Sequence, residues 1–204
     1  TPIKSSAASD VYKRQGYIDK TGKIAIEPKY DMAYSFTDGL ALVSEGGREG
    51  FIDTDGNYVI KLTDKVDYAS FSDGYALIRK GNKWGFIDKK GNIVIKPAFY
   101  GAADFKEGFA SIMEKVGDKY LSGYINKKGK MITKAIYEEV DDFQEGMACV
   151  KKNGKYGFIN KKGKLVVNAI YDNAFSYENG LAYVAKGSNA YFIDKTGKKV
   201  ITIK

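Results

Sequence analysis

Apolar and polar positions along this chain follow one pattern that returns about every 34 residues. In each copy a glycine, an aromatic residue and a β-branched residue precede a polar turn, and a second β-branched run follows it. Residues 83–95 read Lys-Trp-Gly-Phe-Ile-Asp-Lys-Lys-Gly-Asn-Ile-Val-Ile. This stretch predicts two short strands joined by a hairpin over residues 88–92. No window of helical length keeps apolar residues at the helical period without a glycine inside it, so the pattern predicts an all-β fold.

The second half of each copy adds one more strand. A connector carries an aromatic residue, and the motif Phe-x-Glu-Gly-x-Ala follows, as in residues 105–110. Alternation of Ala110 and Ile112 predicts a third strand over residues 109–112, with these two side chains facing inward. Each copy therefore predicts a three-stranded antiparallel meander, which is too small to be stable alone.

The copies form a tandem array over residues 16–204. Steps of 34, 35, 38, 34 and 34 residues separate the pivot positions, which are Gly16, Gly50, Gly85, Gly123, Gly157 and, in a partial sixth copy, Tyr191. A fixed period of this size is typical of repeat proteins, in which neighbouring units bury one another. We predict an open, solenoid-like stack of meanders. A closed, propeller-like ring is the alternative, although propeller blades usually have four strands and about 40 residues or more.

The two ends of the chain do not fit the repeat. Residues 1–15 lie outside it, and residues 10–15 resemble the translation of a transposon end used in sequencing libraries. We interpret residues 1–15 as a non-native leader, and such segments are kept out of fold reasoning. The sixth copy stops before its Phe-x-Glu-Gly half. We therefore expect the natural protein to extend beyond both ends.

The composition of the chain excludes several classes of functional site. The formal charge of +8 falls to +6 without residues 1–15, which favours solubility and weak attraction to anionic polymers. There is no histidine, and Cys149 is the one cysteine, so a Cys-His pair, a disulfide within the chain and a cysteine zinc cluster are excluded. No run approaches the ~18 apolar residues of a membrane span. We predict no catalytic residues, no metal and no cofactor.

Two stretches carry a family resemblance. Residues 83–88, Lys-Trp-Gly-Phe-Ile-Asp, and residues 155–160, Lys-Tyr-Gly-Phe-Ile-Asn, resemble the WG (KWG) repeat of bacterial proteins. The resemblance implies a repeat module, often exported, and it implies no reaction. A bacterial surface or extracytoplasmic location is slightly favoured over the cytoplasm. The structural signature comprises Trp84 and Tyr156, expected in the core, the pivots Gly85 and Gly157, and the turn glycines Gly22, Gly56, Gly91, Gly129 and Gly163.

We interpret the recurring polar residues as residues that form turns and cap the backbone. Only Asp or Asn opens the hairpin turns, and this side chain can accept bonds from the backbone N–H groups just ahead of it. The pairs of an acidic or amide residue with glycine, such as Glu107-Gly108, recur in every copy at a turn. We interpret them as backbone caps instead of acid catalysts or calcium ligands.

Three sets of residues are candidates for ligand contact. Lysines at the turn tips would line one edge of an array, as a basic stripe for an anionic polymer or simply as protection of exposed edges. Periodic aromatics would stack on sugar rings or a peptide, or act as wedges in the core. The hairpin at residues 113–122 has four extra residues and includes Tyr120. The candidates are Lys89, Lys90, Lys127, Lys128, Lys161, Lys162, Tyr30, Phe99, Tyr137, Tyr171 and Tyr120.

The sequence thus favours a non-catalytic repeat module that binds a protein or an anionic cell-envelope polymer across several repeats. The alternative is a purely structural stalk that presents another domain. Nucleic acid is not favoured as the partner, because no nucleic-acid-binding fold signature accompanies the lysines. The oligomeric state is left open by the sequence.

Overall fold

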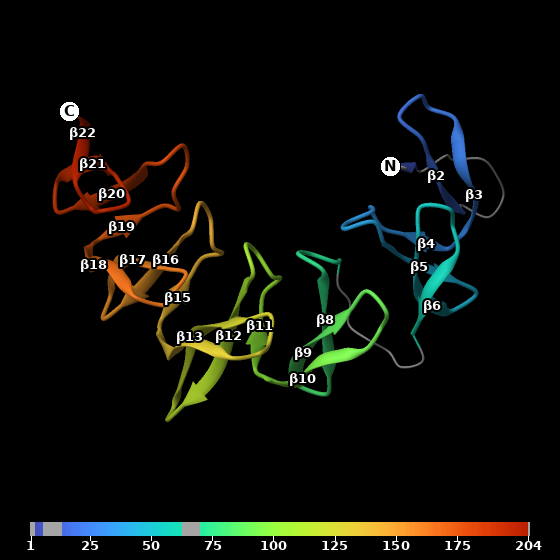
Figure 1. The fold of residues 1–204 in the computed structure, drawn as a ribbon, viewed down its shortest axis with the longest axis horizontal. Helices are drawn as coiled ribbons and strands as arrows, with labels where there is room; N and C mark the ends of the chain where they lie inside the picture. Colours follow the sequence, from blue (N-terminus) through green and yellow to red (C-terminus); the bar gives the residue numbers. More distant parts are fainter. Residues whose placement is uncertain (1–2, 6–13, 63–69, 204) are drawn as a thin grey trace. The chain divides into compact units, whose positions relative to one another are not determined.

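The computed structural model describes residues 3–5, 14–62 and 70–203 of the chain. All helical or extended secondary structure in these residues consists of β-strands. The strands form six small open sheets (Figure 1). The all-β prediction is therefore confirmed. Two compact units divide the chain, Thr1–Pro97 and Ala98–Lys204. No helix in the described part of the chain is long and apolar enough to cross a membrane.

The first unit contains three sheets, with strand orders β1-β2-β3, β4-β5-β6-β7 and β10-β9-β8, here called sheets 1, 2 and 3. Strand β10 ends two residues beyond the boundary of the unit. The strands are β1 (Ile3–Ser5), β2 (Gln15–Ile18), β3 (Ile24–Tyr30), β4 (Met32–Ala33), β5 (Ala41–Glu45), β6 (Arg48–Ile52), β7 (Tyr58–Lys61), β8 (Tyr75–Lys80), β9 (Lys83–Asp88) and β10 (Ile93–Phe99).

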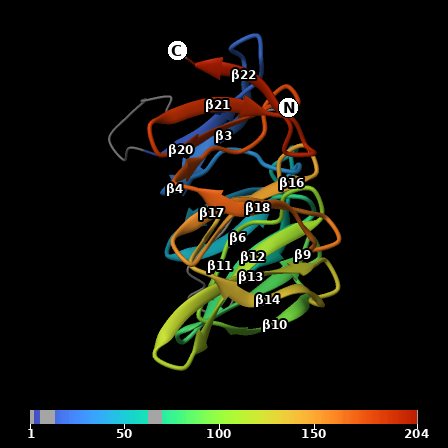
Figure 2. The ribbon, with the colours of Figure 1, turned by 90° about the vertical axis from the view of Figure 1, so that its left-hand side faces the viewer.

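The second unit contains sheets 4, 5 and 6, each with four antiparallel strands in sequence order. Figure 2 shows β12, β13 and β14 of sheet 4 side by side. The strands are β11 (Gly101–Ala102), β12 (Phe109–Val116), β13 (Lys119–Asn126), β14 (Met131–Tyr137), β15 (Glu139–Val140), β16 (Met147–Lys152), β17 (Lys155–Asn160), β18 (Leu165–Tyr171), β19 (Asn173–Ala174), β20 (Ala182–Lys186), β21 (Asn189–Ile193) and β22 (Lys199–Ile203).

The sheets differ from the expected meanders in two ways. The third strand of each repeat pairs with the first strand of the next repeat, as β16 does with β17, because a tight hairpin joins these two strands. A two-residue strand that the sequence did not predict, such as β15, adds a fourth member at the edge. It forms because the connector runs back along the third strand. The sheet is therefore offset from the sequence motif by half a repeat.

Part of the leader takes part in sheet 1. Strand β1 pairs with β2 in the place that a third strand takes in the other sheets, with Ile3 opposite Ile18. The rest of residues 1–13 lies outside the described residues. The interpretation of residues 1–15 as a foreign segment stays a prediction.

The pivot glycines permit a close backbone crossing. A Cβ at Gly157 would lie 2.5 Å from the Val167 carbonyl oxygen and 2.7 Å from the Ala169 nitrogen. Strand β18 crosses β17 here with a shift of register, so that Tyr156 pairs with Tyr171 and Phe158 with Val167. Only glycine allows two backbones to approach this closely. Equivalent clashes at the other four pivots explain why glycine recurs at this place in the repeat.

The hydrophobic core lies between successive sheets. In the first unit Tyr17 and Ile26 of sheet 1 pack with Val43 and Ile52 of sheet 2, all of them buried. In the second unit Phe158 and Val167 of sheet 5 pack in the same way with residues of sheet 6, among them Ile193. Each inner sheet of a unit therefore buries both faces, and a single repeat could not do so alone.

Candidate binding surfaces

The hairpin turns are held by the residue that opens them. The Asn160 side-chain oxygen accepts hydrogen bonds from the backbone N–H groups of Lys162, at 3.0 Å, and Lys164, at 3.2 Å. The same pair of bonds is made at Asp19, Asp53, Asp88, Asn126 and Asp194. The pKa of each of the four aspartates is lowered, mainly by a side-chain hydrogen bond at Asp19, Asp88 and Asp194 and by a backbone N–H at Asp53. The predicted turn chemistry is confirmed.

The acidic residues before glycine join one sheet to the next. Glu145, at the turn before β16, accepts a bond from the backbone N–H of Gly180 at 2.9 Å, and the Lys195 ammonium lies 3.0 Å from the same carboxylate. Gly180 and Lys195 both belong to the turns of sheet 6, whereas Glu145 belongs to sheet 5. We call this arrangement the clasp. It is repeated by Glu107 with Gly146 and Lys161, and by Asp38 with Gly74 and Lys89.

The clasp lowers the pKa of two of its carboxylates. The Lys195 hydrogen bond and the Gly180 N–H hold the pKa of Glu145 below its ordinary value. At Glu107 burial acts to raise the pKa, but the bonds from Lys161 and Gly146 outweigh it and the pKa is lowered. Lys89 and Lys161, predicted as ligand contacts, therefore have a carboxylate partner in the preceding sheet. Lys127 also makes an interaction and is not a free charge.

A second set of lysines keeps its charge in solvent. The side chains of Lys128, Lys130, Lys162 and Lys164 are exposed on the hairpins of sheets 4 and 5, and none makes an ion pair with a described residue. These two hairpins open with Asn126 and Asn160, whereas the others open with Asp. Their turns therefore hold lysines and no carboxylate. We call these four lysines the lysine patch. Lys90 is exposed at the equivalent tip of sheet 3.

The two hairpins of the lysine patch lie close together. The turn glycine of sheet 5, Gly163, packs against the backbone of Ile132 in sheet 4, so the tip of one hairpin touches the strand that leaves the other. Charge is also uneven along the chain. Residues 98–204 carry 18 basic and 12 acidic side chains, whereas residues 16–97 carry 12 of each. The net charge of +6 therefore belongs to the second unit.

Three of the four periodic aromatics are core residues. Tyr30, Tyr137 and Tyr171 are at most 4% exposed, so their rings cannot stack on a ligand, and the prediction of ligand contact is wrong for them. They wedge between sheets, as the alternative interpretation held. The fourth, Phe99, is half-buried.

Two signature residues are less buried than the sequence indicated. Trp84 and Tyr156 are half-buried instead of lying fully in the core, because each sits beside the pivot glycine near the end of its strand. The Arg79 guanidinium lies 5.7 Å from the centre of the Trp84 ring, and the Lys151 ammonium 5.1 Å from that of Tyr156. Both distances are within the range of a cation–π contact.

The long hairpin of sheet 4 departs from the repeat. In sheets 2, 5 and 6 a carboxylate caps a glycine of the hairpin, as Asp172 does by accepting the Gly187 N–H at 2.7 Å. Sheet 4 has Tyr100 at that place, and its ring packs edge-on against Tyr120 with 5.3 Å between centroids. Tyr100 is 42% exposed and Tyr120 is 51% exposed. Sequence reasoning found Tyr120 and missed Tyr100, although Tyr100 stands where three other copies have an acidic residue.

The one thiol of the chain, Cys149, lies in the core of the second unit. Cys149 is buried, and burial raises its pKa to about 12, so the thiolate that a nucleophile needs is not formed at neutral pH. Within residues 3–5, 14–62 and 70–203, no group of three or more Cys, Asp or Glu side chains is arranged to hold a metal ion.

Comparison with known proteins identifies the repeat. The pattern of the WG containing repeat matches residues 16–48, 50–84, 84–120, 123–156 and 156–189. The chain therefore belongs to the WG containing repeat family, and the five predicted repeats are confirmed. No curated protein matches the chain.

Solved structures show likeness of fold alone. A crystal structure titled as the eukaryotic initiation factor has a TM-score of 0.60 at 12% identity, over 100% of this chain and 62% of that one. Hsv2p of Kluyveromyces lactis has a TM-score of 0.51 at 12% identity, over 88% of this chain and 65% of that one. This chain thus matches less than two thirds of the length of either structure. Hsv2 is propeller-like, whereas the six sheets described here are each open and none closes into a barrel.

Proposed function

We propose that this member of the WG containing repeat family is a non-catalytic module that binds an anionic cell-envelope polymer through its second unit. One observation carries the proposal. The lysine patch places four unpaired ammonium groups on two adjacent hairpins that contain no carboxylate. A polymer with one charge per repeating unit can meet several such groups at once, and the field of the whole unit adds to their attraction.

A non-catalytic role is supported by the use of the recurring polar residues. The Asp and Asn residues of the hairpins hold turns, and the acidic residues before glycine hold clasps. Acid–base catalysis needs two titratable groups with contrasting pKa values in one cleft. These recurring residues instead form hydrogen bonds and ion pairs that hold turns and join sheets. Hydrolysis of any substrate by the pure chain, above that of a variant with the same residues blocked, would contradict this part of the proposal.

The test is sedimentation of the chain with bacterial cell-wall sacculi, with and without teichoic acid, at low and high salt. We expect binding that needs the teichoic acid and that is lost at high salt, because exposed charges are screened beyond about 10 Å at 0.1 M salt. The variant Lys130→Gln with Lys162→Gln removes two charges of the lysine patch and is expected to weaken binding several-fold.

A matched control separates this patch from general charge. Lys23 and Lys90 occupy the same two turn positions in sheets 1 and 3, within the unit that has no net charge outside the leader. Replacement of both by Gln changes the total charge equally and should leave binding nearly unchanged. Equal loss in the two double variants, or binding that high salt does not weaken, would refute the proposal.

A second candidate is a protein partner at the long hairpin of sheet 4. The exposed Tyr100–Tyr120 pair favours it, because paired aromatic rings that are open to solvent are typical anchors of protein interfaces. Such binding would resist salt and would be lost in a variant with both tyrosines changed to Ala. Absence of any partner for the chain would instead support the structural stalk.

A further inference from the structure

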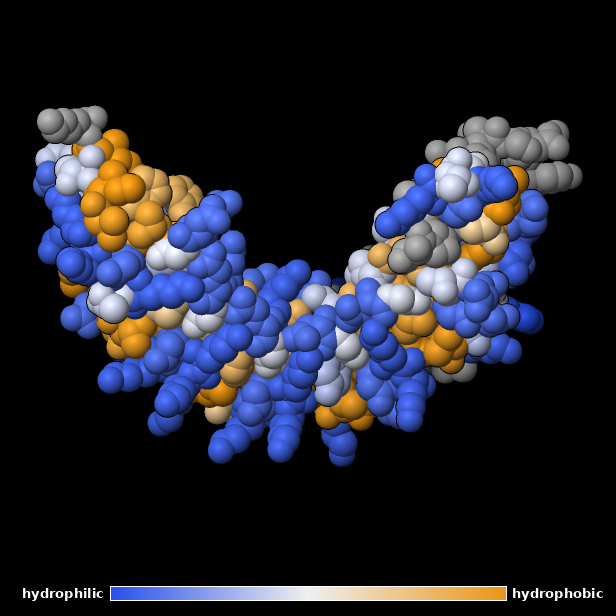
Figure 3. Space-filling model, turned by 45° about the horizontal axis from the view of Figure 1, so that its top comes forward, coloured by the Kyte–Doolittle hydropathy of each residue, from blue (hydrophilic) through white to orange (hydrophobic). Residues whose placement is uncertain are grey.

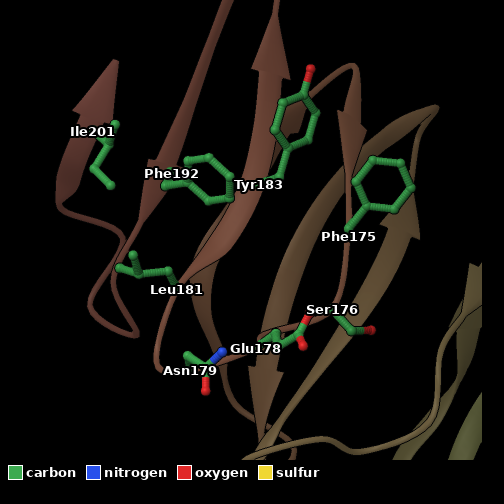
Figure 4. A pocket seen from close by; sticks show the side chains of 8 residues that line it. All are labelled: Phe175, Ser176, Glu178, Asn179, Leu181, Tyr183, Phe192 and Ile201. Atoms are coloured by element: carbon green, nitrogen blue, oxygen red, sulfur yellow. The ribbon is translucent and has the colours of Figure 1, made fainter. Parts of the chain in front are cut away.

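Sheet 6 has a hollow on each of its faces. Tyr191 and Phe192 are neighbours on β21, so their side chains lie on opposite faces of the sheet. The hollow beside Phe192 is apolar, and Figure 4 shows its lining, which includes Ile201. Figure 3 shows the hydrophobic surface over this end of the chain. The hollow beside Tyr191 is lined by polar side chains and reaches Tyr171 of sheet 5, inside the second unit.

The polar hollow combines cations with hydrogen-bonding groups. Its volume of about 400 Å³ is within the range of small-molecule sites. The side chains of Lys186 and Lys199 are exposed at its rim, and the rings of Tyr171 and Tyr191 meet edge-on with 6.1 Å between centroids. We call this hollow the polar pocket. Its lining residues, none of them acidic, are Tyr171, Lys186, Asn189, Tyr191, Gly197 and Lys199.

Packing between sheets 5 and 6 fixes the walls of the polar pocket. Tyr171, at the end of β18, is buried in the core that the two sheets share, and Tyr191 packs against the same core. A Cβ at Gly197 would lie 3.4 Å from Val167 of β18. The Lys199 ammonium lies 4.6 Å from the centre of the Tyr191 ring. The pocket is therefore built by contacts inside the unit.

Sheet 2 fills the corresponding place with its own side chains. Strand pairing puts Glu45 at the end of its hairpin, where sheet 6 has Lys186. It puts Tyr58 at the start of the outer strand, where sheet 6 has Lys199. The Tyr58 hydroxyl donates to the Glu45 carboxylate at 3.3 Å, near the buried Tyr30. A carboxylate thus occupies this place in sheet 2, whereas sheet 6 has two lysines and no carboxylate in the lining.

The two lysines of the polar pocket keep their charges available. Neither makes an ion pair with a described residue. The acidic group whose charge reaches Lys186 is Asp172, and its carboxylate is already held by the Gly187 N–H, at 2.7 Å, and by the Lys155 ammonium. An anion that enters the pocket therefore meets two ammonium groups that lack a close partner.

We propose that the polar pocket binds one sugar unit that carries an anionic group, either a carboxylate or a phosphate. The anion lies between Lys186 and Lys199, in the place that the Glu45 carboxylate takes in sheet 2. The Tyr191 hydroxyl and the Asn189 amide can each donate and accept hydrogen bonds, as sugar hydroxyls require. The pocket is also far larger than a bare phosphate ion needs. It shares no residue with the lysine patch and does not depend on polymer binding there.

The test is an NMR titration of the full ¹⁵N-labelled chain with four probes, which are glucuronic acid, glucose 6-phosphate, glucose and inorganic phosphate. We expect the two acidic sugars to shift the Asn189 side-chain amide and the Gly197 backbone amide, with a Kd on the order of 1 mM. They should bind about tenfold or more tightly than glucose, because only they make charge-assisted bonds. They should also bind several-fold more tightly than inorganic phosphate, which lacks the sugar ring.

Variants separate the parts of the pocket. Lys186→Gln with Lys199→Gln should weaken binding of both acidic sugars about tenfold or more and leave glucose unchanged. Lys152→Gln with Lys198→Gln is the matched control for charge. Lys152 stands at the same hairpin place in sheet 5, Lys198 precedes Lys199, and both are exposed and outside the lining. Tyr191→Phe removes one hydroxyl and should weaken the acidic sugars several-fold without changing the affinity for phosphate.

Four results would overturn the proposal. The first is absence of shifts at Asn189 and Gly197 with either acidic sugar up to about 20 mM. Glucose that binds as tightly as the acidic sugars would refute the role of the lysines. Phosphate that binds as tightly would show a simple anion site only. Equal loss in the control variant would show general attraction of charge. The Lys130→Gln, Lys162→Gln chain should bind the sugars normally, so this outcome is separate from the test with cell walls.

Discussion

Replacement of the pivot Gly157 by Ala is the sharpest test of how one repeat is built. The new methyl group would meet the carbonyl oxygen of Val167 at 2.5 Å, the nitrogen of Ala169 at 2.7 Å and its Cα at 2.8 Å. All three are backbone atoms of β18, so no side chain can rotate away. The strand itself must move out of the crossing.

The cost follows from these contacts. Overpacking of a well-packed site costs about 1–3 kcal/mol, and a clash with three backbone atoms belongs at the upper end. Loss of glycine freedom in the unfolded chain offsets about 0.4–1 kcal/mol. A net loss of about 2 kcal/mol in the free energy of unfolding remains. For a chain of about 200 residues this corresponds to a decrease in Tm of about 4–8 °C.

Differential scanning calorimetry measures the effect, and Gly101→Ala is the matched control. A Cβ at Gly101 would meet only the Met113 side chain, at 3.3 Å and beyond, so its Tm should change by no more than about 3 °C. The chain also contains its own comparison. Tyr191 stands at the pivot of sheet 6, and there β22 stays in step with β21 from Ala190 to Phe192. A Tm for Gly157→Ala within 1 °C of the unchanged chain would refute the reasoning.

Three further predictions concern the clasp, the turns and the buried thiol. Because the folded-state pKa values of Glu107 and Glu145 are lowered, these carboxylates stabilise the fold above about pH 4.5 and lose that effect as the pH falls through the folded pKa. Changing both to Gln should lower Tm at pH 7, and the gap to the unchanged chain should close below about pH 4. A constant gap would contradict the clasp. Asn160→Ala should cost about 1 kcal/mol in urea unfolding and Asn160→Asp almost nothing, since only the former removes the acceptor. Cys149 should react with a thiol reagent only after unfolding, and rapid labelling at pH 8 would contradict its burial.

The sequence was most informative where a residue acts on its own neighbours. The Asp or Asn that opens each hairpin was predicted to accept backbone N–H bonds, and Asn160 does so with residues two and four places ahead. Such contacts depend only on local geometry and are repeated six times. The period was equally clear, because a side chain that is buried in every copy must recur in every copy.

The sequence was least informative where contacts join different sheets. Glu145 was predicted to cap its own turn, but it binds Gly180, 35 residues further on. Tyr137 and Lys161 appeared equally suited to a ligand. One is instead buried and the other paired, each against a neighbouring sheet. The sequence of a single repeat does not indicate which of its faces the next repeat will cover. For the same reason the sequence did not predict that the third strand of one repeat shares a sheet with the first strand of the next.

The clasp explains why an acidic residue recurs before glycine. In the tight turn Gln144-Glu145-Gly146-Met147 both central residues have positive φ, 53° at Glu145 and 81° at Gly146. Asn or Gly would suit such a turn better than Glu, whose backbone is strained at positive φ. Contact across the sheets is what favours the acid, because its carboxylate can reach both Gly180 and Lys195. Replacement of Glu145 by Asn should therefore suit the turn itself but lower the stability, because the contacts with Gly180 and Lys195 would be lost.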